Sequence, residues 1–268
     1  MERSTGQSSR TLAVADRTSR SVQVVLRDVG GIALLTRDIL TRGLRHIEWR
    51  LLLQQLEHLG WRSLNIVNLT AIFTGMVMTL QMGIFLAQFG AKIYINRVVG
   101  LAILRELGPV LTALMIGGRV GAGIAAELGS MAVTEQLDAM RALGADPIRK
   151  LVMPRILALL IAMPALTVIA DTLGILGSYL ISIGELRVDP TFYFSSLFLW
   201  LWFGDILSGL GKSLFFAYFI GIIACHIGMN VTGGADGVGR ATTKTVVACS
   251  ITVLVSDFFL TKVFWLLP

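Results

Sequence analysis

Charged residues are scarce in this chain, because Asp, Glu, Lys and Arg together make up only 15% of its 268 residues. Soluble domains carry roughly a quarter charged residues, whereas hydrophobic residues here reach 54%. This balance excludes an ordinary soluble domain. Histidine and cysteine are also few, with three and two copies, and their scattered positions match no metal-binding spacing. The sequence also lacks a Gly-x-Ser-x-Gly elbow and a paired-carboxylate arrangement, so nothing indicates a hydrolase acting within the membrane.

Long apolar runs are what the chain has instead. Five of them are long enough to cross about 30 Å of hydrocarbon as helices, which takes roughly 20 residues. The runs are continuous and do not alternate between apolar and polar residues, which argues against a membrane β-barrel. We therefore predict an all-α membrane protein, a bundle of five transmembrane helices. The expected spans are about 63–91, 98–131, 151–183, 207–230 and 244–266.

Two segments precede the first span. Residues 1–42 are polar and Arg-rich and show no signal-peptide pattern, so we expect a cytoplasmic segment and a first span that anchors the chain itself. Residues 43–62 mix charges with apolar residues at helical spacing, and Trp49 and Trp61 are suited to the headgroup layer. We predict an interfacial elbow helix on the inner leaflet, with an ordinary amphipathic packing helix as the alternative.

Basic residues are distributed unevenly along the chain. Ten arginines precede the first span, and four basic residues surround the polar segment 134–147. By the positive-inside rule, the N-terminus and this segment are cytoplasmic and the C-terminus lies outside. The net charge of +6 is therefore interpreted as a topology signal, and no nucleic acid is expected as a partner. Residues 184–206 then lie outside, where their aromatic residues favour a surface helix or a plain loop.

The polar segment 134–147 lies between two apolar spans and is competent to form a short helix. Glu135 and Asp138 would occupy its first turn, where acidic groups favour the positive end of the helix dipole. Gly144 favours a left-handed stop, and Asp146 can cap the helix that follows. We expect a rigid helix-turn-helix that is presented to a partner in water. The alternative is a solvated loop that only joins two spans.

The glycine-rich run at 234–240 comes close to the spacing of a nucleotide-binding P-loop. However, Arg240 stands where the P-loop has lysine, and Ala241 stands where it has the Ser or Thr that binds magnesium. The run also follows an apolar span and not a buried strand. We therefore interpret it as a glycine-rich inner turn, and we predict that the chain has no ATPase site and binds no cofactor of its own.

Arg119 and Glu127 fall inside the second predicted span, where ionisable groups are costly and usually face a cavity or a partner. Eight residues separate them, which corresponds to about 12 Å along a helix axis. They are therefore expected to pair with other helices and not with each other. We favour a structural role for both, with a role in transport as the alternative.

Several motifs carry a resemblance to a known family. Together they resemble the MlaE (YrbE-type) permeases, the membrane subunits of MCE-associated phospholipid ABC transporters. The similarity covers about residues 43–265, with the motifs in the same order as in the family. The matching runs are Arg105 to Pro109, Gly118 to Gly123, Ala126 to Gly129, Thr134 to Met140, Asp146-Pro147, Gly233 to Thr243 and Ser256 to Thr261.

The resemblance implies that 134–147 is a coupling helix that docks into a groove on a separate ATPase subunit. ATP and magnesium would then be used by that subunit. The residues expected to carry this contact are Glu135, Leu137, Asp138, Met140, Arg141 and, in the glycine-rich run, Arg240.

The resemblance also implies a lipid cavity that opens toward the outside. A lipid headgroup would need cationic and hydrogen-bonding partners there, and flexible methionines would suit an adaptable apolar wall. For the charged residues, ion pairs that hold the bundle together are an equally weighted alternative. The lipid-pathway candidates are Arg105, Glu106, Asp205, Lys212, Met78 and Met82.

The leading hypothesis is an ABC permease in the bacterial inner membrane. As the resemblance implies, two copies would join two ATPase subunits and move phospholipid between this membrane and a periplasmic MCE-domain protein, expected to be a hexamer. This activity would maintain the lipid asymmetry of the outer membrane. A small STAS-domain subunit is a further candidate partner. The alternative is a proton-coupled secondary transporter that uses the intramembrane acids Asp171 and Asp257, although its usual sign, an inverted repeat, is not evident.

Overall fold

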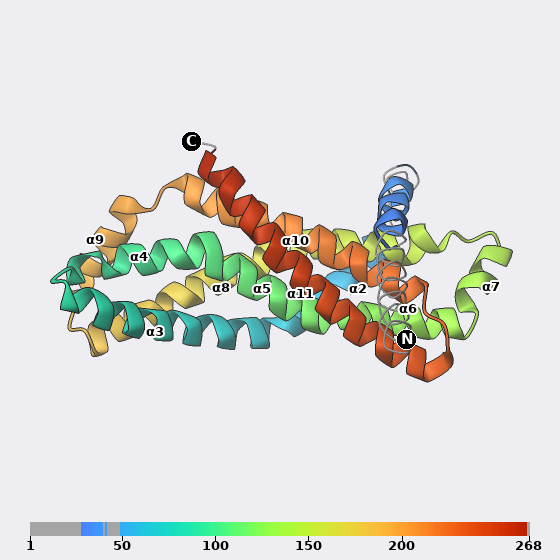
Figure 1. Ribbon diagram of the computed structural model, residues 1–268, viewed down its shortest axis with the longest axis horizontal. Helices are drawn as coiled ribbons and strands as arrows, with labels where there is room; N and C mark the ends of the chain where they lie inside the picture. The colour runs from blue at the N-terminus through green and yellow to red at the C-terminus, as the bar shows by residue number, and fades with distance from the viewer. Residues whose placement is uncertain (1–27, 40, 42–48, 267–268) are drawn as a thin grey trace, which may run out of the picture.

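The computed structural model describes residues 28–39, 41 and 49–266 (Figure 1). Within these residues the chain is almost entirely helical, and no strand occurs among them. The predicted all-α fold class is confirmed. Since a backbone in lipid must satisfy its own hydrogen bonds, helices are the structure that long apolar runs of this kind adopt.

Five helical stretches are long and apolar enough to cross a membrane, the number that the sequence predicts. Their bounds are Trp49–Gln88, Lys92–Val133, Ile148–Gly184, Phe203–Met229 and Gly234–Phe264. The first and last begin well before the predicted spans, for reasons that differ.

The first stretch begins with α2 (Trp49–Gln55) and continues through a π turn and a 3-10 turn into α3 (Leu64–Gln88). The second half of the predicted elbow segment is therefore helical and runs directly into the first span. Trp49 and Trp61 are both exposed on it. Residues 43–48 lie outside the described residues, and a position at the membrane interface stays a prediction.

The last stretch, α11 (Gly234–Leu266), includes the glycine-rich run that was interpreted as a turn. That interpretation is wrong, because positive φ in residues 233–240 is confined to Gly233 and Gly234, and the Gly237 amide already donates a helical hydrogen bond to the Gly233 carbonyl at 3.2 Å. Asp236 in the first turn also favours a helix start at this point.

The second stretch is a chain of short helical pieces. It begins with the 3-10 turn η4 (Lys92–Tyr94), and two π turns then interrupt it, each at a charged motif of the sequence. Pro109 lacks the amide that a regular helix would use, which fits a break directly before it. π turns inside helices are frequent at functional sites. The remaining pieces are α4 (Ile95–Ala102), the π turn η5 (Ile103–Leu107), α5 (Gly108–Ile116), the π turn η6 (Gly117–Gly121) and α6 (Ala122–Val133).

Besides the helical residues 28–39, the rest of the bundle contains two short helices and two long ones. The short ones lie at opposite ends of the long axis in Figure 1. They are α7 (Gln136–Ala142), which follows α6, and α9 (Pro190–Trp200). The long ones are α8 (Met153–Gly184), which follows the π turn η7 (Ile148–Val152), and α10 (Phe203–Met229).

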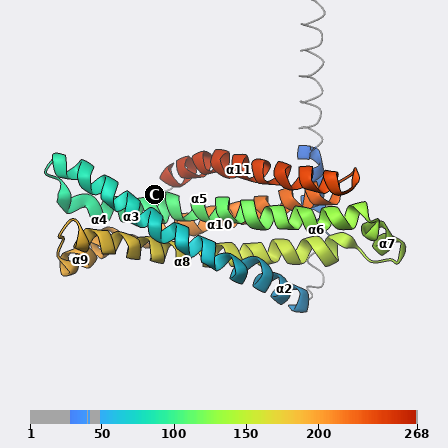
Figure 2. The ribbon, with the colours of Figure 1, turned by 90° about the horizontal axis from the view of Figure 1, so that it is seen from below.

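The core lies around α8 and α10. Helix α3 packs along α8, while α6, α8 and α11 all pack against α10. In Figure 2, α11 runs along one side of the bundle, with α5 and α10 between it and α8. The first and last spans are the least buried of the five, and they present many large apolar side chains outward. These two faces are where lipid or another chain can cover the bundle.

Candidate coupling segment and outer charge cluster

The polar segment 134–147 forms the end of the bundle at which α6 and α8 are joined (Figure 1). Its charged candidates, Glu135, Asp138 and Arg141, are exposed, and Met140 is half-buried. Arg141 donates to the Asp138 carboxylate at 2.8 Å. Two acidic groups and one basic group thus face water beside one another.

Leucine side chains in this segment face in opposite directions. Leu137 is buried in its own chain, with 3% exposure, so it supports α7 and is not presented to a partner. Leu143 is 86% exposed. An isolated apolar side chain this exposed, at the tip of a polar segment, is the one that a docking partner can reach. The three-residue spacing of Leu137, Met140 and Leu143 predicts that they share one helical face, which is wrong for Leu143, because it lies just beyond the end of α7.

The turns at the two ends of α7 have left-handed backbone. Glu135 has φ of 59° and caps α7, so the expectation that it lies in the first turn is wrong. The amides of Thr134 and Glu135 complete the last turn of α6, and the chain reverses at Glu135. At the other end, Gly144 has φ of 76°, as expected. The Ile148 amide donates to the Asp146 carboxylate at 3.0 Å, so the predicted cap is formed.

The four charged lipid-pathway candidates come together near the α9 end of the bundle, in two neighbouring pairs. Arg105 Nε lies 2.6 Å from Asp205 Oδ1. Lys212 Nζ lies 2.6 Å from Glu106 Oε2. The Asp205 carboxylate also accepts the Trp202 amide at 2.9 Å and so caps α10. We call these residues, together with Asp257 and Thr261, the outer charge cluster.

Helix α11 supplies the two members of the cluster that the site prediction missed. Lys212 Nζ lies 3.0 Å from Asp257 Oδ1 and donates to the Thr261 hydroxyl at 2.7 Å. The Thr261 hydroxyl in turn donates to Glu106 at 3.2 Å. Asp257 and Thr261 are four residues apart in one span, a spacing that places them on one helical face. This spacing could have indicated a shared polar face on the last span, but it does not show that Lys212 and Glu106 are the partners of Asp257 and Thr261.

A cavity of about 620 Å³ opens beside the outer charge cluster. The residues from η5 and α10 are all polar, whereas α11 supplies three apolar side chains, Leu254, Phe258 and Phe264, beside three polar ones. It can therefore accept a molecule that is charged at one end and apolar at the other. The lining residues are Arg105, Glu106, Ser208, Lys212, Leu254, Asp257, Phe258, Thr261, Lys262 and Phe264.

Met78 and Met82 lie elsewhere. They pack against the buried cluster of Ile95, Val99 and Ile103 on α4 and η5. Within one chain, neither methionine lines the cavity beside the outer charge cluster. Their role in a lipid pathway remains a prediction.

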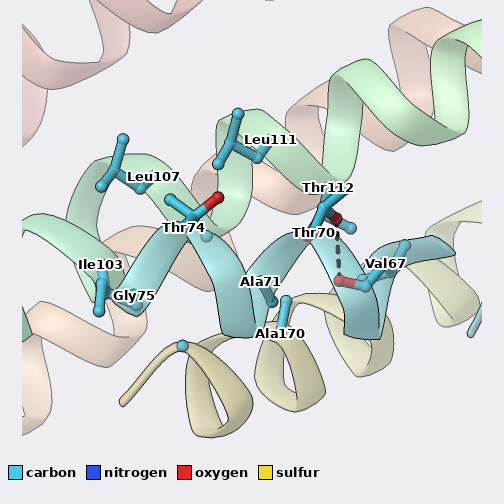
Figure 3. Close-up of a pocket in the computed structure, with 12 residues that line it drawn as sticks. Val67, Thr70, Ala71, Thr74, Gly75, Ile103, Leu107, Leu111, Thr112 and Ala170 are labelled. Carbon is cyan, nitrogen blue, oxygen red and sulfur yellow. Dashed lines mark hydrogen bonds between the residues drawn. The ribbon is translucent and has the colours of Figure 1, made fainter. Parts of the chain in front are cut away.

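A second, much smaller cavity lies between α3, α5 and α8 (Figure 3). Its volume is about 20 Å³, and Thr70, Thr74 and Thr112 line it among mainly apolar side chains. A space of this size holds about one water molecule. It is therefore too small for a lipid.

The two acids of the proton-coupled alternative are in different surroundings. Asp257 is ion-paired with Lys212 in the outer charge cluster. Asp171 on α8 is 7% exposed, and its Oδ1 has no hydrogen-bond partner among the described residues. It faces Gly108, since a Cβ added there would overlap the carboxylate. Among the hydrogen bonds described here, none joins the two acids into a relay.

Arg119 and Glu127 pair with other helical segments, as expected. Arg119 donates to the Ser63 hydroxyl at 2.8 Å. Glu127 Oε1 lies 2.8 Å from Arg155 Nη2 at the start of α8. Both contacts join neighbouring spans, in agreement with a structural role.

Arg240 is exposed in the first turns of α11. It lines a shallow hollow with Asp236, Thr243 and Lys244. Because the glycine-rich run is helical there, its amides are largely used within α11 and do not form a phosphate-binding loop.

Helix α9 occupies the predicted outer segment 184–206. The Asp189 carboxylate caps it by accepting the amides of Thr191 and Phe192. The Thr191 hydroxyl also donates to this carboxylate, and these hydrogen bonds, the hydroxyl's first, hold the pKa of Asp189 below its usual value. Phe198 and Leu199 are exposed on the helix. The result is a capped helix with an apolar face, compatible with a membrane surface.

Comparison with known proteins gives one family match over most of the chain. A family model described as Permease MlaE matches residues 52–263. A probable ABC transporter permease protein of Rickettsia felis is 45% identical over 215 residues, which cover 80% of this chain and 83% of the relative.

Two further relatives have more specific names. The intermembrane phospholipid transport system permease protein MlaE of Haemophilus influenzae is 39% identical over 214 residues, covering 80% of this chain and 82% of the relative. The chloroplastic protein TRIGALACTOSYLDIACYLGLYCEROL 1 of Arabidopsis thaliana is 41% identical over 219 residues, covering 82% of this chain and 63% of the relative.

Proposed function

The chain belongs to the MlaE permease family, and on this premise we propose that it is the membrane subunit of an ABC transporter for phospholipids. It would move lipid between the bacterial inner membrane and a periplasmic MCE-domain protein, and so maintain outer-membrane lipid asymmetry. The names of the Rickettsia and Haemophilus relatives support the ABC permease class and the phospholipid cargo.

The observation that carries the proposal is the cavity beside the outer charge cluster. A phospholipid has a charged headgroup and apolar chains, and this cavity is lined by charged side chains together with apolar side chains of α11. The headgroup phosphate would lie near Arg105 and Lys262, while the acyl chains would contact Phe258 and Phe264. Charge-assisted hydrogen bonds of this kind favour a phosphate strongly where water is excluded.

A second copy of the chain would complete the cavity. Helix α11 supplies the apolar side chains that line it and is also the least buried span. A homodimer that pairs through α11 would cover exposed Ile251, Leu254 and Phe258 and enclose the cavity. Symmetric pairing through one face is the usual way in which identical subunits assemble.

Two ATPase subunits would bind the inner ends of this dimer and hydrolyse ATP with magnesium. Glu135, Asp138, Met140 and Arg141 would contact the ATPase together with exposed Leu143, and Arg240 would lie at the edge of the contact. Leu137, being buried, would support this surface from within. ATP-driven closure of the ATPase pair would then displace α7 and change the shape of the cavity.

The position of the chain in the cell envelope and its further partners complete the proposal. The distribution of basic residues supports a cytoplasmic N-terminus and a periplasmic C-terminus. An MCE-domain hexamer would receive or deliver lipid near α9, and a small STAS-domain protein is a further candidate subunit.

The test is lipid crosslinking in the reconstituted complex. The chain with its ATPase in vesicles that contain a photoactivatable phosphatidylethanolamine should crosslink to lipid through the cavity. Lys262→Ala should lower crosslinking about threefold, because it removes a cation that a phosphate would contact. Lys92→Ala is the matched control, an exposed lysine outside the cavity. Equal crosslinking of the two variants would refute the assignment of the cavity.

A further inference from the structure

The ion pair between Glu127 and Arg155 lies at the base of the coupling segment. Glu127 is on α6, which leads into α7, and Arg155 is on α8, which follows it. Arg155 Nη2 lies 2.8 Å from Glu127 Oε1, and its Nη1 donates to the Leu151 carbonyl at 3.0 Å. The pair therefore joins the two helices that α7 connects in the chain.

Close packing on α10 surrounds this ion pair. A Cβ added at Gly228 of α10 would lie 2.9 Å from Leu128 Cβ on α6. A Cβ added at Gly221 would lie 3.2 Å from the side chain of Ile156 on α8. Helix α10 thus approaches α6 and α8 closely next to the pair, and the three helices form one packed unit. We call this unit the inner clamp.

Helix α7 is itself weakly held. It has seven residues, and turns with left-handed backbone at Glu135 and Gly144 flank it. It packs chiefly against α6, the helix that precedes it in the chain. A force applied to α7 can therefore turn it about these two ends unless α6 and α8 are tied together.

The inner clamp also connects to the outer charge cluster. Helix α6 continues through η6 and α5 to η5, which carries Glu106, and α10 carries Lys212. A displacement of the clamp as one unit would therefore reach both members of the Lys212–Glu106 ion pair. A displacement of α6 alone would reach only one of them.

The burial of the pair distinguishes positioning from simple stabilisation. The Arg155 side chain is 2% exposed, whereas Glu127 is 53% exposed. The presence of a buried ion pair is weak evidence that it stabilises the fold, and its best-attested other use is to fix the register of packed helices. Arg155 Nε has no hydrogen-bond partner among the described residues, and the guanidinium is paired with the Glu127 carboxylate through Nη2.

We propose that Glu127 and Arg155 are positioning residues that make α6 and α8 move together when the ATPase displaces α7. The inference rests on the proposed function. Without the pair, α7 would still bind the ATPase and move with its cycle, but this movement would no longer displace α6 and α8 together. ATP hydrolysis would continue while lipid transport falls.

The experiment compares ATP hydrolysis with lipid transfer in the full reconstituted complex. Glu127→Gln should keep the ATPase subunit bound and its rate within about twofold, while lipid moved per ATP falls about tenfold, within the usual range of coupling between sites. Two variants should each recover at least about half of the lipid moved per ATP in the unchanged complex. One is Glu127→Asp, and the other is the double variant Glu127→Arg with Arg155→Glu, which exchanges the two charges. Glu57→Gln removes an exposed acid on the same side of the bundle and should behave as the unchanged chain.

An unchanged ratio in Glu127→Gln would overturn the proposal. So would loss of the ATPase subunit from that variant, since the pair would then only hold the fold. Amide exchange supplies a readout that does not need transport. Residues 136–142 should exchange faster in Glu127→Gln than in Glu57→Gln, and equal exchange overturns the clamp. If the unchanged complex moves no lipid, the proposed function fails, whereas the exchange result still decides the clamp.

Discussion

Lys212 is the residue on which the outer charge cluster depends. It is buried and lies within ion-pair distance of two carboxylates, Glu106 and Asp257, and it donates to Thr261. In lipid, two carboxylates at this distance from one ammonium group need that group as a counterion. The same ammonium cannot be wholly given to a lipid phosphate. We therefore assign the phosphate to Arg105 and Lys262, and the balance of charge within the cluster to Lys212.

Removal of the Lys212 charge should destabilise the protein. Lys212→Ala leaves Glu106 and Asp257 without their shared partner, at a cost on the order of 2 kcal/mol. The cost is smaller than for a fully buried pair, because the two carboxylate side chains keep 39% and 21% exposure. The measurement is the midpoint of thermal unfolding in detergent.

Neutral partners provide the control for Lys212. The triple variant Lys212→Met, Glu106→Gln and Asp257→Asn removes all three charges and should recover most of the lost stability, since no uncompensated charge remains. If the Lys212→Ala variant unfolds at the same temperature as the unchanged protein, this lysine does not act as a counterion.

At the scale of elements, α7 combines a polar surface with one apolar side chain. Its charges face water, Leu137 holds it from within, and Leu143 follows its end with 86% exposure. Interfaces often concentrate their binding energy in a few side chains, which are surrounded by contacts that contribute little but exclude water. Helix α7 has the composition of a small docking element.

Replacement of Leu143 should weaken binding of the ATPase without changing the fold. We expect Leu143→Ser to reduce the ATPase that co-purifies with the chain about tenfold, because it removes the apolar contact at the centre of a polar surface. Leu199→Ser is the control, a leucine with 76% exposure on α9 at the opposite end of the bundle. Equal retention of ATPase by the two variants would assign the docking contact to another part of the segment.

The interruptions of the second span are also a feature of elements. The π turn η5 presents Arg105 and Glu106, and the π turn η6 presents Arg119. A π turn widens the helix and shifts the side chains that follow it around the axis. The positions of these charges therefore depend on irregular backbone that a regular 3.6-residue pattern does not describe.

At the scale of the whole molecule, the bundle is incomplete as a single chain. The first and last spans carry broad apolar faces on its outside, and the cavity beside the outer charge cluster opens next to the last one. Lipid alone can cover an apolar face. A cavity that contains ion pairs in the membrane is better closed by protein, because open contact between charges and lipid is costly.

A dimer through α11 should be captured by crosslinking. Single cysteines at exposed positions of α11, in a chain whose two native cysteines are buried, should form disulfide-linked dimers in the membrane, with at least one position reacting in about half of the chains. Val168→Cys and Leu176→Cys on α8 are the controls, since they are exposed on another helix. The α11 positions are Val247, Ile251, Leu254 and Val255. Crosslinking from α8 that equals crosslinking from α11 would contradict this interface.

Local signals in the sequence were sufficient for the elements. The scarcity of charge and the five apolar runs determined an all-α membrane protein, because lipid leaves a backbone no partner but itself. Gly144 and Asp146 determined the end of α7 and the start of the next helix, because a left-handed glycine and an aspartate cap act within a few residues. The prediction for the glycine-rich run at 234–240 was wrong because it used composition alone. Its glycines favour a turn, but the run forms the start of helix α11.

Only the tertiary structure decided which of these residues meet. Thr261 and Glu106 are 155 residues apart in the chain and share a hydrogen bond, and Glu127 finds Arg155 across the coupling segment. Such partners depend on how each helix is rotated about its axis and where π turns shift it, and no local period records either quantity. The sequence by itself thus determined the helices and the family, and the packing of the helices decided the outer charge cluster, the exposed leucine of α7 and the inner clamp.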